Sequence, residues 1–158
     1  MKILVFSDSH GYIENMNSAI KLNSDADMII HLGDCTKDIF KVMDKHPGYR
    51  YEFVRGNNDW LPDIPAEKQL DICGMKILLT HGHQYGVKSG YGSLQKKCTA
   101  LNYNAVFFGH THMTEDIFSE GLLMINPGSI SLPVYPAKPT YCTAEISKGK
   151  INVKFLPV

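Results

Sequence analysis

Six short hydrophobic runs set the framework of this chain. They are rich in β-branched and aromatic residues and are bounded by Gly, Asp or Asn, which is typical of buried β-strands. The runs cover residues 2–6, 28–32, 51–55, 76–80, 105–108 and 122–125. Between some of them, apolar residues three and four positions apart predict helices with one buried face. These helical patterns include Ile13, Met16 and Ile20, then residues 39–43, and then Leu94, Cys98 and Leu101. The pattern predicts an α/β fold.

The two halves of the chain differ in the order of these elements. The first half alternates strand, helix, strand, helix, strand, which favours parallel pairing through crossover connections. In the second half, Gly74 and the segment 148–150 each separate two strand-like runs, and this predicts two hairpins. Two sheets packed together and flanked by helices would accommodate both halves. Because the chain has 158 residues and no repeat or linker, we expect a single domain over 1–158.

Composition limits the classes of partner. Lys plus Arg and Asp plus Glu both total 16, so no net field would draw the protein onto nucleic acid or an acidic membrane, and a nucleic acid would be a substrate rather than a stable partner. No run approaches the roughly 18 apolar residues of a membrane helix, and the first apolar run is too short for a signal peptide. A cytoplasmic protein is expected. The four cysteines are scattered without a CxxC pair, which favours free thiols.

Polar residues follow five of the predicted strands at the point where each strand ends. In open α/β sheets, ligand sites lie at the carboxyl ends of the strands. Each motif alone is compatible with an ordinary turn or helix cap, because Gly, Asn and Asp tolerate turn conformations. Five such motifs at one edge predict a metal site. They are Asp8-Ser9-His10, Gly33-Asp34, Gly56-Asn57-Asn58-Asp59, His81-Gly82-His83 and Gly109-His110-Thr111-His112.

The types of ligand narrow the chemistry of this site. Carboxylate, amide oxygen and imidazole, without cysteine at the strand ends, suit Mn²⁺, Fe or Zn²⁺ better than a thiolate site would. Their number suits two ions, and paired ions about 3.5 to 4 Å apart are the usual device for phosphoester cleavage. Asp34 is the predicted bridging carboxylate because it follows the middle strand of the parallel half.

The ordered motifs resemble the calcineurin-like metallophosphoesterase superfamily. The resemblance runs through DSH (8–10), GD (33–34), GNND (56–59), THGH (80–83) and GHTH (109–112). The length of the chain and NPGS at 126–129 are most similar to the small bacterial and archaeal phosphodiesterase branch. The resemblance implies a four-layer α/β/β/α sandwich of two mixed sheets with a dinuclear metal site. NPGS itself predicts a type II turn, which the resemblance puts beside the site.

The resemblance also implies the ligands. One ion would be held by Asp8, His10, Asp34 and His112, and the other by Asp34, Asn57, His81 and His110. The residues expected to take part in catalysis are Asp34, Asn57, His81 and His83. For His83, a contact with the substrate and a structural hydrogen bond both stay open. Mn²⁺ is the preferred ion, with Fe, Zn²⁺ and Ni²⁺ as alternatives.

One pair of positions departs from the family pattern. Many members carry a histidine after the ligating asparagine, thought to protonate the leaving group and to be oriented by the last Asp of GDxxD. Here these positions hold Asn58 and Lys37, with Asp38 one place further on. Asparagine cannot act as a proton donor, so the proton would come from water, from another residue such as His83, or would not be needed.

The leading functional hypothesis is a metal-dependent phosphodiesterase, in which a hydroxide bridging two ions attacks phosphorus in line. A phosphomonoesterase or nucleotide hydrolase is the second hypothesis. The third is a non-catalytic scaffold of the same fold, as in the retromer trafficking subunit. The expected partner is a small phosphodiester, and self-association into a homo-oligomer stays open. His31 and His46 belong to no motif, which favours a core or surface role.

Overall fold

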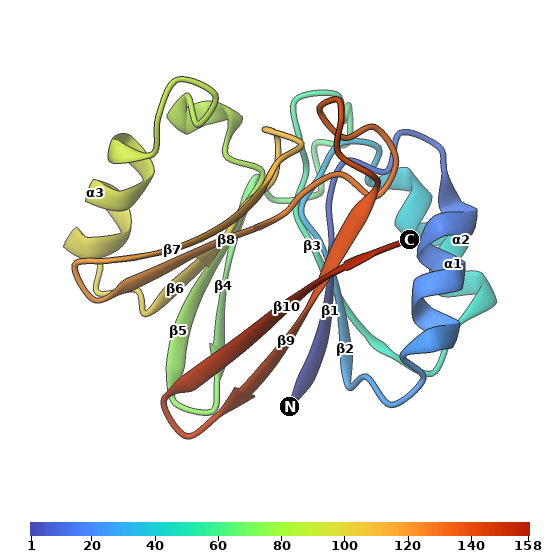
Figure 1. The fold of residues 1–158 in the computed structure, drawn as a ribbon, viewed down its shortest axis with the longest axis horizontal. Helices are drawn as coiled ribbons and strands as arrows, with labels where there is room; N and C mark the ends of the chain where they lie inside the picture. Colours follow the sequence, from blue (N-terminus) through green and yellow to red (C-terminus); the bar gives the residue numbers. More distant parts are fainter.

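Two five-stranded sheets packed face to face form the body of the protein. The computed structural model describes residues 1–158. The first sheet has the order β10-β9-β1-β2-β3 and the second has the order β4-β5-β6-β8-β7. Helices α1 and α2 cover the outer face of the first sheet, and α3 covers the outer face of the second (Figure 1). The predicted α/β/β/α sandwich is therefore confirmed.

The bounds of the elements agree closely with the predicted runs. The first sheet contains β1 (Lys2–Phe6), β2 (Met28–His31), β3 (Arg50–Phe53), β9 (Thr140–Ser147) and β10 (Lys150–Pro157). The second contains β4 (Glu67–Ile72), β5 (Met75–Thr80), β6 (Ala105–Phe107), β7 (Thr114–Ser119) and β8 (Leu122–Pro127). The helices are α1 (Ile13–Leu22), α2 (Lys37–Lys45), α3 (Gly92–Ala100) and the short 3-10 helix η1 (His83–Tyr85). As predicted, β1, β2 and β3 pair in parallel, and β4–β5 and β9–β10 pair as antiparallel hairpins.

The central strands are apolar along their whole length because both of their faces are covered. In β1, Ile3 and Val5 belong to the core between the two sheets. Leu4 and Phe6 point the other way, into the core beneath α1 and α2. Successive side chains of a strand alternate between its faces, so a strand with two covered faces reads as a continuous hydrophobic run. This double burial explains why these strands could be recognised in the sequence.

Two features differ from the prediction. Strand β7 was not predicted, and its residues alternate between exposed and half-buried positions at the edge of the second sheet. An edge strand with one solvated face carries few apolar residues, so its sequence signal is weak. In α3, Leu94 and Cys98 are buried as expected, but Leu101 lies just beyond the end of the helix and is 47% exposed.

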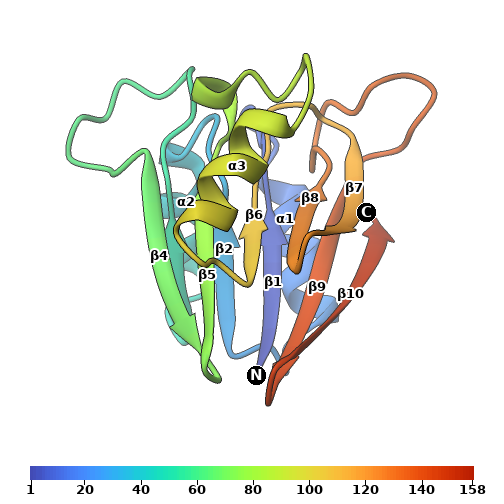
Figure 2. The ribbon, with the colours of Figure 1, turned by 90° about the vertical axis from the view of Figure 1, so that its left-hand side faces the viewer.

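The carboxyl ends of the parallel strands meet at one edge of the sandwich. Figure 2 shows this edge uppermost, with the loop before β4 and the loop before β9 on opposite sides of it. The segments that follow β1, β2, β5 and β6 lie between these two loops. None of the helices is long and apolar enough to cross a membrane.

Candidate metal centre

Six of the predicted ligands form two neighbouring groups at this edge. Within each group, ligand atoms lie within 4.8 Å of one another. The first group is Asp8, His10 and His112, and the second is Asp34, His81 and His110. The groups adjoin through His81, because its Nε2 lies 3.4 Å from Asp34 Oδ1 and 3.9 Å from Asp8 Oδ1. The fold therefore brings together residues that are up to about a hundred positions apart.

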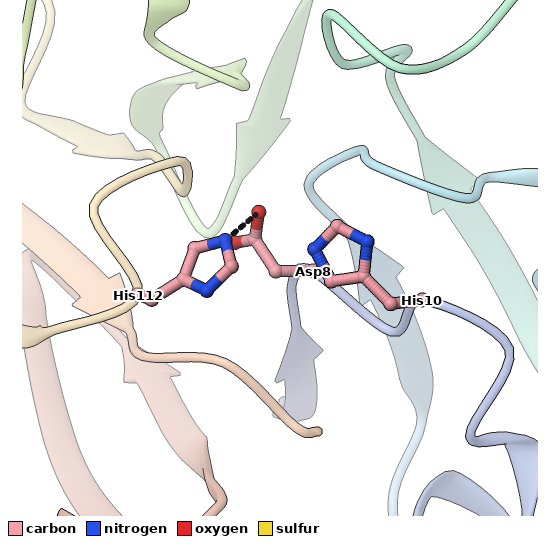
Figure 3. A group of neighbouring side chains, drawn as sticks. All are labelled: Asp8, His10 and His112. Atoms are coloured by element: carbon pink, nitrogen blue, oxygen red, sulfur yellow. Dashed lines mark ion pairs between the residues drawn. The ribbon is translucent and has the colours of Figure 1, made fainter. Parts of the chain in front are cut away.

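The first group joins the loop after β1 to the loop after β6. Figure 3 shows Asp8 between the two imidazole rings, with its carboxylate turned toward His112. The Nε2 atom of His112 lies 3.2 Å from Asp8 Oδ1. Asp8 Oδ1 nevertheless accepts no well-aligned hydrogen bond, and the buried Nε2 of His10 has no partner either. This group thus holds two buried polar atoms with unused lone pairs.

The second group is more fully paired. His110 Nδ1 lies 3.2 Å from His81 Nε2. The carboxylate of Asp34 accepts hydrogen bonds from Asn58 at both oxygens, at 2.9 Å from the backbone N–H and at 2.7 Å from the side-chain amide. Asn58 therefore fixes the orientation of the predicted bridging carboxylate. Its amide cannot serve as a proton donor to a leaving group, in agreement with the expectation from the sequence.

Backbone carbonyls set the orientation of two of the imidazole rings. His81 Nδ1 lies 2.9 Å from the carbonyl oxygen of Leu32, and His112 Nδ1 lies 2.5 Å from that of Leu132. A ring that donates its Nδ1–H to a carbonyl presents the lone pair of Nε2 on the opposite side, which is the usual arrangement of a metal-binding histidine. In both residues, Nε2 is the atom that faces the carboxylates.

The backbone is strained where these ligands are presented. Five of the predicted ligands have positive φ angles, between 43° and 71°. They are Asp8, His10, Asp34, His110 and His112. Residues other than glycine rarely adopt this left-handed backbone conformation. Those that do cluster at functional sites, where the surrounding structure holds them in place. The positive φ angles therefore lie at the predicted ligands themselves, as is common at functional sites.

Glycines provide the close approach between the loops. A Cβ atom on Gly56 would lie 2.2 Å from Asp34 Oδ1, and one on Gly109 would lie 2.0 Å from Ser7 Oγ and 3.1 Å from Asp8 Oδ2. Neither position leaves room for a side chain. The glycines of the GNND and GHTH motifs are therefore required by the space around the two carboxylates.

The acidic and imidazole groups shift one another's pKa. Burial acts to raise the pKa of Asp34, but the hydrogen bonds and charge of His81, together with the hydrogen bonds from Asn58, outweigh burial and lower it. Burial likewise acts to raise the pKa of Asp8, and the ion pair with His112 and the charge of His81 lower it overall. The pKa of His81 is raised, because its two carboxylate neighbours outweigh its burial. The buried carboxylates of Asp8 and Asp34 thus lie 3.9 Å and 3.4 Å from His81 Nε2, and each group shifts the pKa of the others.

Burial and the nearby charge of His81 lower the pKa of His110 to about 4. This imidazole therefore stays neutral at neutral pH, which is the form that binds metal ions.

Asn57 and His83, also predicted to act at this site, lie beside the second group. Asn57 is exposed and sits between Gly56 and Asn58, both of which contact Asp34. The ring of His83 is 5.5 Å from that of His81 and 6.1 Å from that of His110. Its buried Nδ1 has no hydrogen-bond partner. A purely structural hydrogen bond at that atom is therefore absent.

Several supporting hydrogen bonds, and the part played by Ser131, were not predicted from the sequence. Ser129 Oγ and Ser131 Oγ donate hydrogen bonds of 2.9 Å and 2.7 Å to the carbonyl oxygen of Asp8. The side chain of Asn126 donates to Gly109 O at 2.9 Å. The NPGS segment therefore lies beside the site, as the resemblance implied, and Gly128 adopts a positive φ of 76°. The resemblance was the signal for this placement, and the hydrogen-bond partners became visible only in the structure.

Two aspartates brace the loops that carry ligands. The carboxylate of Asp59, the last residue of GNND, accepts hydrogen bonds from the backbone N–H groups of Asp34, Thr36 and Gly56 and from the Thr36 hydroxyl. Asp38 is buried and accepts hydrogen bonds from Ser9 Oγ at 2.9 Å and Gly11 N at 2.7 Å. Asp38 therefore holds the segment around His10, although it lies one place beyond the family position.

The remaining histidines and the cysteines agree with the sequence prediction. His31 is fully buried, with its Nε2 3.2 Å from Ser9 Oγ, and burial lowers its pKa to about 4. His46 is half-buried, its Nε2 lies 3.2 Å from Asn17 Oδ1, and it belongs to neither ligand group. All four cysteines are free. Neither histidine belongs to the metal centre.

The residues present fit divalent metal ions. Buried polar atoms without a partner are costly, and Asp8 Oδ1 and His10 Nε2 are two such atoms in one ligand group. The second group brings a buried carboxylate within 4.8 Å of two imidazoles. A cation bound at each group would satisfy the lone pairs and balance the buried negative charge.

Comparison with known proteins identifies the family. The sequence model of the calcineurin-like phosphoesterase superfamily domain matches residues 1–149. The chain belongs to this superfamily. It is 33% identical over 157 residues to a probable metallophosphoesterase, YsnB, of Bacillus subtilis, and the match covers 98% of this chain and 90% of that protein. It is 32% identical over 147 residues to the phosphodiesterase MJ0936 of Methanocaldococcus jannaschii, covering 81% and 83% of the two chains.

Solved structures share the fold. A predicted phosphoesterase from Streptococcus pneumoniae superimposes with a TM-score of 0.81 at 25% identity, over 99% of this chain and 88% of that one. Vps29 of Entamoeba histolytica, solved in complex with Zn²⁺, gives a TM-score of 0.77 at 21% identity, over 99% and 98% of the two chains. The second likeness shows the fold alone. Family membership and the two ligand groups together support a metal-dependent phosphoesterase.

Proposed function

We propose that the protein is a phosphodiesterase that uses two divalent metal ions, with Mn²⁺ as the preferred ion. The observation that carries this proposal is the pair of adjoining ligand groups, in which His81 Nε2 lies between the carboxylates of Asp8 and Asp34. Asp8, His10, Asp34 and His112 would hold one ion, and Asp34, Asn57, His81 and His110 the other. Asp34 would contact both.

The bound ions would supply a hydroxide between them at neutral pH, for in-line attack on phosphorus, and would neutralise charge on the phosphoryl oxygens. The protein's own part is to hold the ligands rigidly. Asn58 fixes both oxygens of Asp34, and the carbonyl of Leu132 fixes the ring of His112. His83 is free at Nδ1 and lies beside His81 and His110, so it is placed to donate a hydrogen bond to the substrate.

A diester is preferred over a monoester on two grounds. The usual leaving-group dyad is absent, because Asn58 bonds Asp34 and Lys37 replaces the family aspartate. A relative that covers most of the chain is named as a phosphodiesterase. The equal numbers of acidic and basic side chains favour a small substrate over a long polyanion.

The test compares two activated esters with the Mn²⁺-loaded protein. We expect hydrolysis of bis(p-nitrophenyl) phosphate, its abolition by EDTA, and two bound ions per chain by elemental analysis. Faster hydrolysis of p-nitrophenyl phosphate would favour the phosphomonoesterase hypothesis instead. A protein that binds no metal at stoichiometric level and turns over neither ester would support the scaffold hypothesis.

A further inference from the structure

Two cavities adjoin the metal centre at different ligand groups, and a third, lined by Lys88, Tyr91 and His112 among others, adjoins the first group as well. The first, of about 450 Å³, is lined by Asn57, Arg55 and Trp60 among others. The second, of about 440 Å³, is lined by His112, Val134, Tyr135 and Lys138 among others. Each falls within the range of small-molecule pockets, roughly 300–1,000 Å³. Each is joined to the centre through a residue assigned to the metals, Asn57 in the first cavity and His112 in the second.

The two cavities share a chemical pattern. Each contains one cationic side chain and one aromatic ring that is almost wholly exposed. Trp60 and Tyr135 are both 93% exposed, whereas most aromatic side chains of the protein are buried or half-buried. Arg55 accompanies Trp60, and Lys138 accompanies Tyr135. A basic group beside an exposed aromatic ring is the pattern with which proteins bind nucleotides, because the ring stacks on a base and the cation attracts phosphate.

Both rings stand on braced segments. Trp60 directly follows Asp59, whose carboxylate accepts four hydrogen bonds from Gly56, Asp34 and Thr36. Tyr135 lies in a turn closed by a hydrogen bond of 2.9 Å from Ala137 N to Val134 O. The loops that carry the two rings lie on opposite sides of the strand ends in Figure 2. A phosphate at the metal centre would therefore have one aromatic platform on each side.

We propose that the substrate is a phosphodiester that joins two nucleosides, with one base stacked on Trp60 and the other on Tyr135. This inference rests on the proposed phosphodiesterase function and names its substrate class. Water adds across one P–O bond, so that one nucleoside leaves as its alcohol and the other keeps the phosphate as a monoester. Two separate cavities, each with a cationic side chain and an exposed aromatic ring, suit two bases better than one acyl chain, which would need a continuous apolar wall. The absence of net charge suits a footprint of two nucleotides rather than a long strand.

The test uses two substrates that differ in what they offer the cavities. Thymidylyl-thymidine carries a base on each side of its phosphate, and methyl p-nitrophenyl phosphate probes the metal centre with little else. The quantity compared is the ratio of kcat/KM for the first substrate to kcat/KM for the second. In Trp60→Ala and in Tyr135→Ala, we expect this ratio to fall by roughly 5- to 150-fold, the range for loss of one base-stacking contact. Trp60→Phe and Tyr135→Phe keep an aromatic ring and should restore most of the ratio.

Phe118→Ala is the matched control, because Phe118 is 74% exposed on β7 and lines neither cavity. It should leave the ratio unchanged. If the ratio stays unchanged in Trp60→Ala or in Tyr135→Ala, the inference that each ring binds a base is overturned. It is also overturned if the wild type cleaves the small diester but not thymidylyl-thymidine. A wild type that cleaves no diester would instead refute the proposed function. A longer oligonucleotide that ends in two thymidines distinguishes free dinucleotides from strand ends. If it is cleaved at its end as fast as the dinucleotide, the substrate is the end of a strand.

Binding can be measured without turnover. Trp60 is the single tryptophan of the chain, so its fluorescence reports directly on the first cavity. With the Mg²⁺-loaded protein and the slowly cleaved phosphorothioate analogue of thymidylyl-thymidine, we expect saturable quenching. The dissociation constant should rise in Tyr135→Ala and stay unchanged in Phe118→Ala. Absence of saturable quenching would contradict the proposal independently of activity.

Discussion

The two ligand groups differ in how their atoms are paired within the protein. In the second group, both oxygens of Asp34 accept hydrogen bonds from Asn58, and His81 and His110 lie 3.2 Å apart. In the first group, Asp8 Oδ1 and His10 Nε2 are buried and have no hydrogen-bond partner. In the first group, Asp8 Oδ2 does accept hydrogen bonds from Ser7 Oγ and His110 N, so the contrast lies in Asp8 Oδ1 and His10 Nε2, whose lone pairs are left for a bound cation.

This difference indicates that the two ligand groups have different roles in binding metal. An unsatisfied buried polar atom carries the full cost of its lost hydration, so the first group gains most from a bound ion. The second group has its geometry fixed beforehand, and a rigid ligand set is what a metal centre needs in order to hold its reacting atoms in place. Changes near Asp34 should therefore affect activity more than equivalent changes near Asp8.

The largest effect is expected from removing the shared carboxylate. Asp34→Ala takes away the residue assigned to both ions, and we expect kcat/KM for bis(p-nitrophenyl) phosphate to fall by roughly two orders of magnitude or more. Asp44→Ala, at an exposed position of α2, is the matched control and should retain activity. Asp34→Asn, which keeps the shape of the side chain, should be nearly as impaired if charge is what matters. Full activity in Asp34→Ala would exclude the two-metal mechanism.

A smaller but still large effect is expected from closing the space beside Asp34. In Gly56→Ala, the new Cβ would lie 2.2 Å from Asp34 Oδ1 and 2.5 Å from Asp34 N, so the loop or the carboxylate must move. A displacement of about 1 Å at a catalytic group can lower the rate by about 10²-fold, and overpacking costs about 1–3 kcal/mol of stability. Kinetics and thermal unfolding would measure the two effects.

Gly48→Ala provides the control for backbone substitution. No atom lies within 4 Å of a Cβ at Gly48, and we expect its activity and free energy of unfolding to stay close to those of the wild type. Equal behaviour of the two alanine variants would show that the close approach at Gly56 is not required.

The sequence predicts which candidate ligands come together where each lies close to a strand end. Asp8 and His10 lie two and four residues beyond the end of β1, and Asp34 lies three residues beyond the end of β2. Parallel pairing collects the ends of such strands at one edge, so the topology alone brings these ligands together. The two hairpins were predictable for a different reason, because turn residues separate their strand-like runs.

The sequence does not predict contacts made between loops. Ser131 bonds the carbonyl of Asp8 across 123 positions, and Asn58 bonds Asp34 across 24. Neither bond follows from spacing or propensity, because each depends on the final path of two loops. Asn58 is a clear example: the sequence shows that a histidine is absent, but only the structure shows that the amide orients the neighbouring carboxylate.

The smallest effects are expected from two residues that hold the ligands in place, Asn58 beside Asp34 and Ser131 beside Asp8. Asn58→Ala removes the amide that fixes Asp34, and loss of a residue that orients a metal ligand typically costs 10- to 100-fold in metal affinity or activity, so we expect kcat/KM to fall by about 10-fold.

Ser131→Ala removes one of two hydroxyl groups that bond the Asp8 carbonyl, and Ser129 still donates at 2.9 Å. Its loss should therefore stay within about fivefold, since a single neutral hydrogen bond contributes about 1 kcal/mol. Titration with Mn²⁺ should show weaker binding of one ion in Asn58→Ala. If Ser131→Ala were the more damaging of the two, the first group rather than the second would be the one whose geometry limits catalysis.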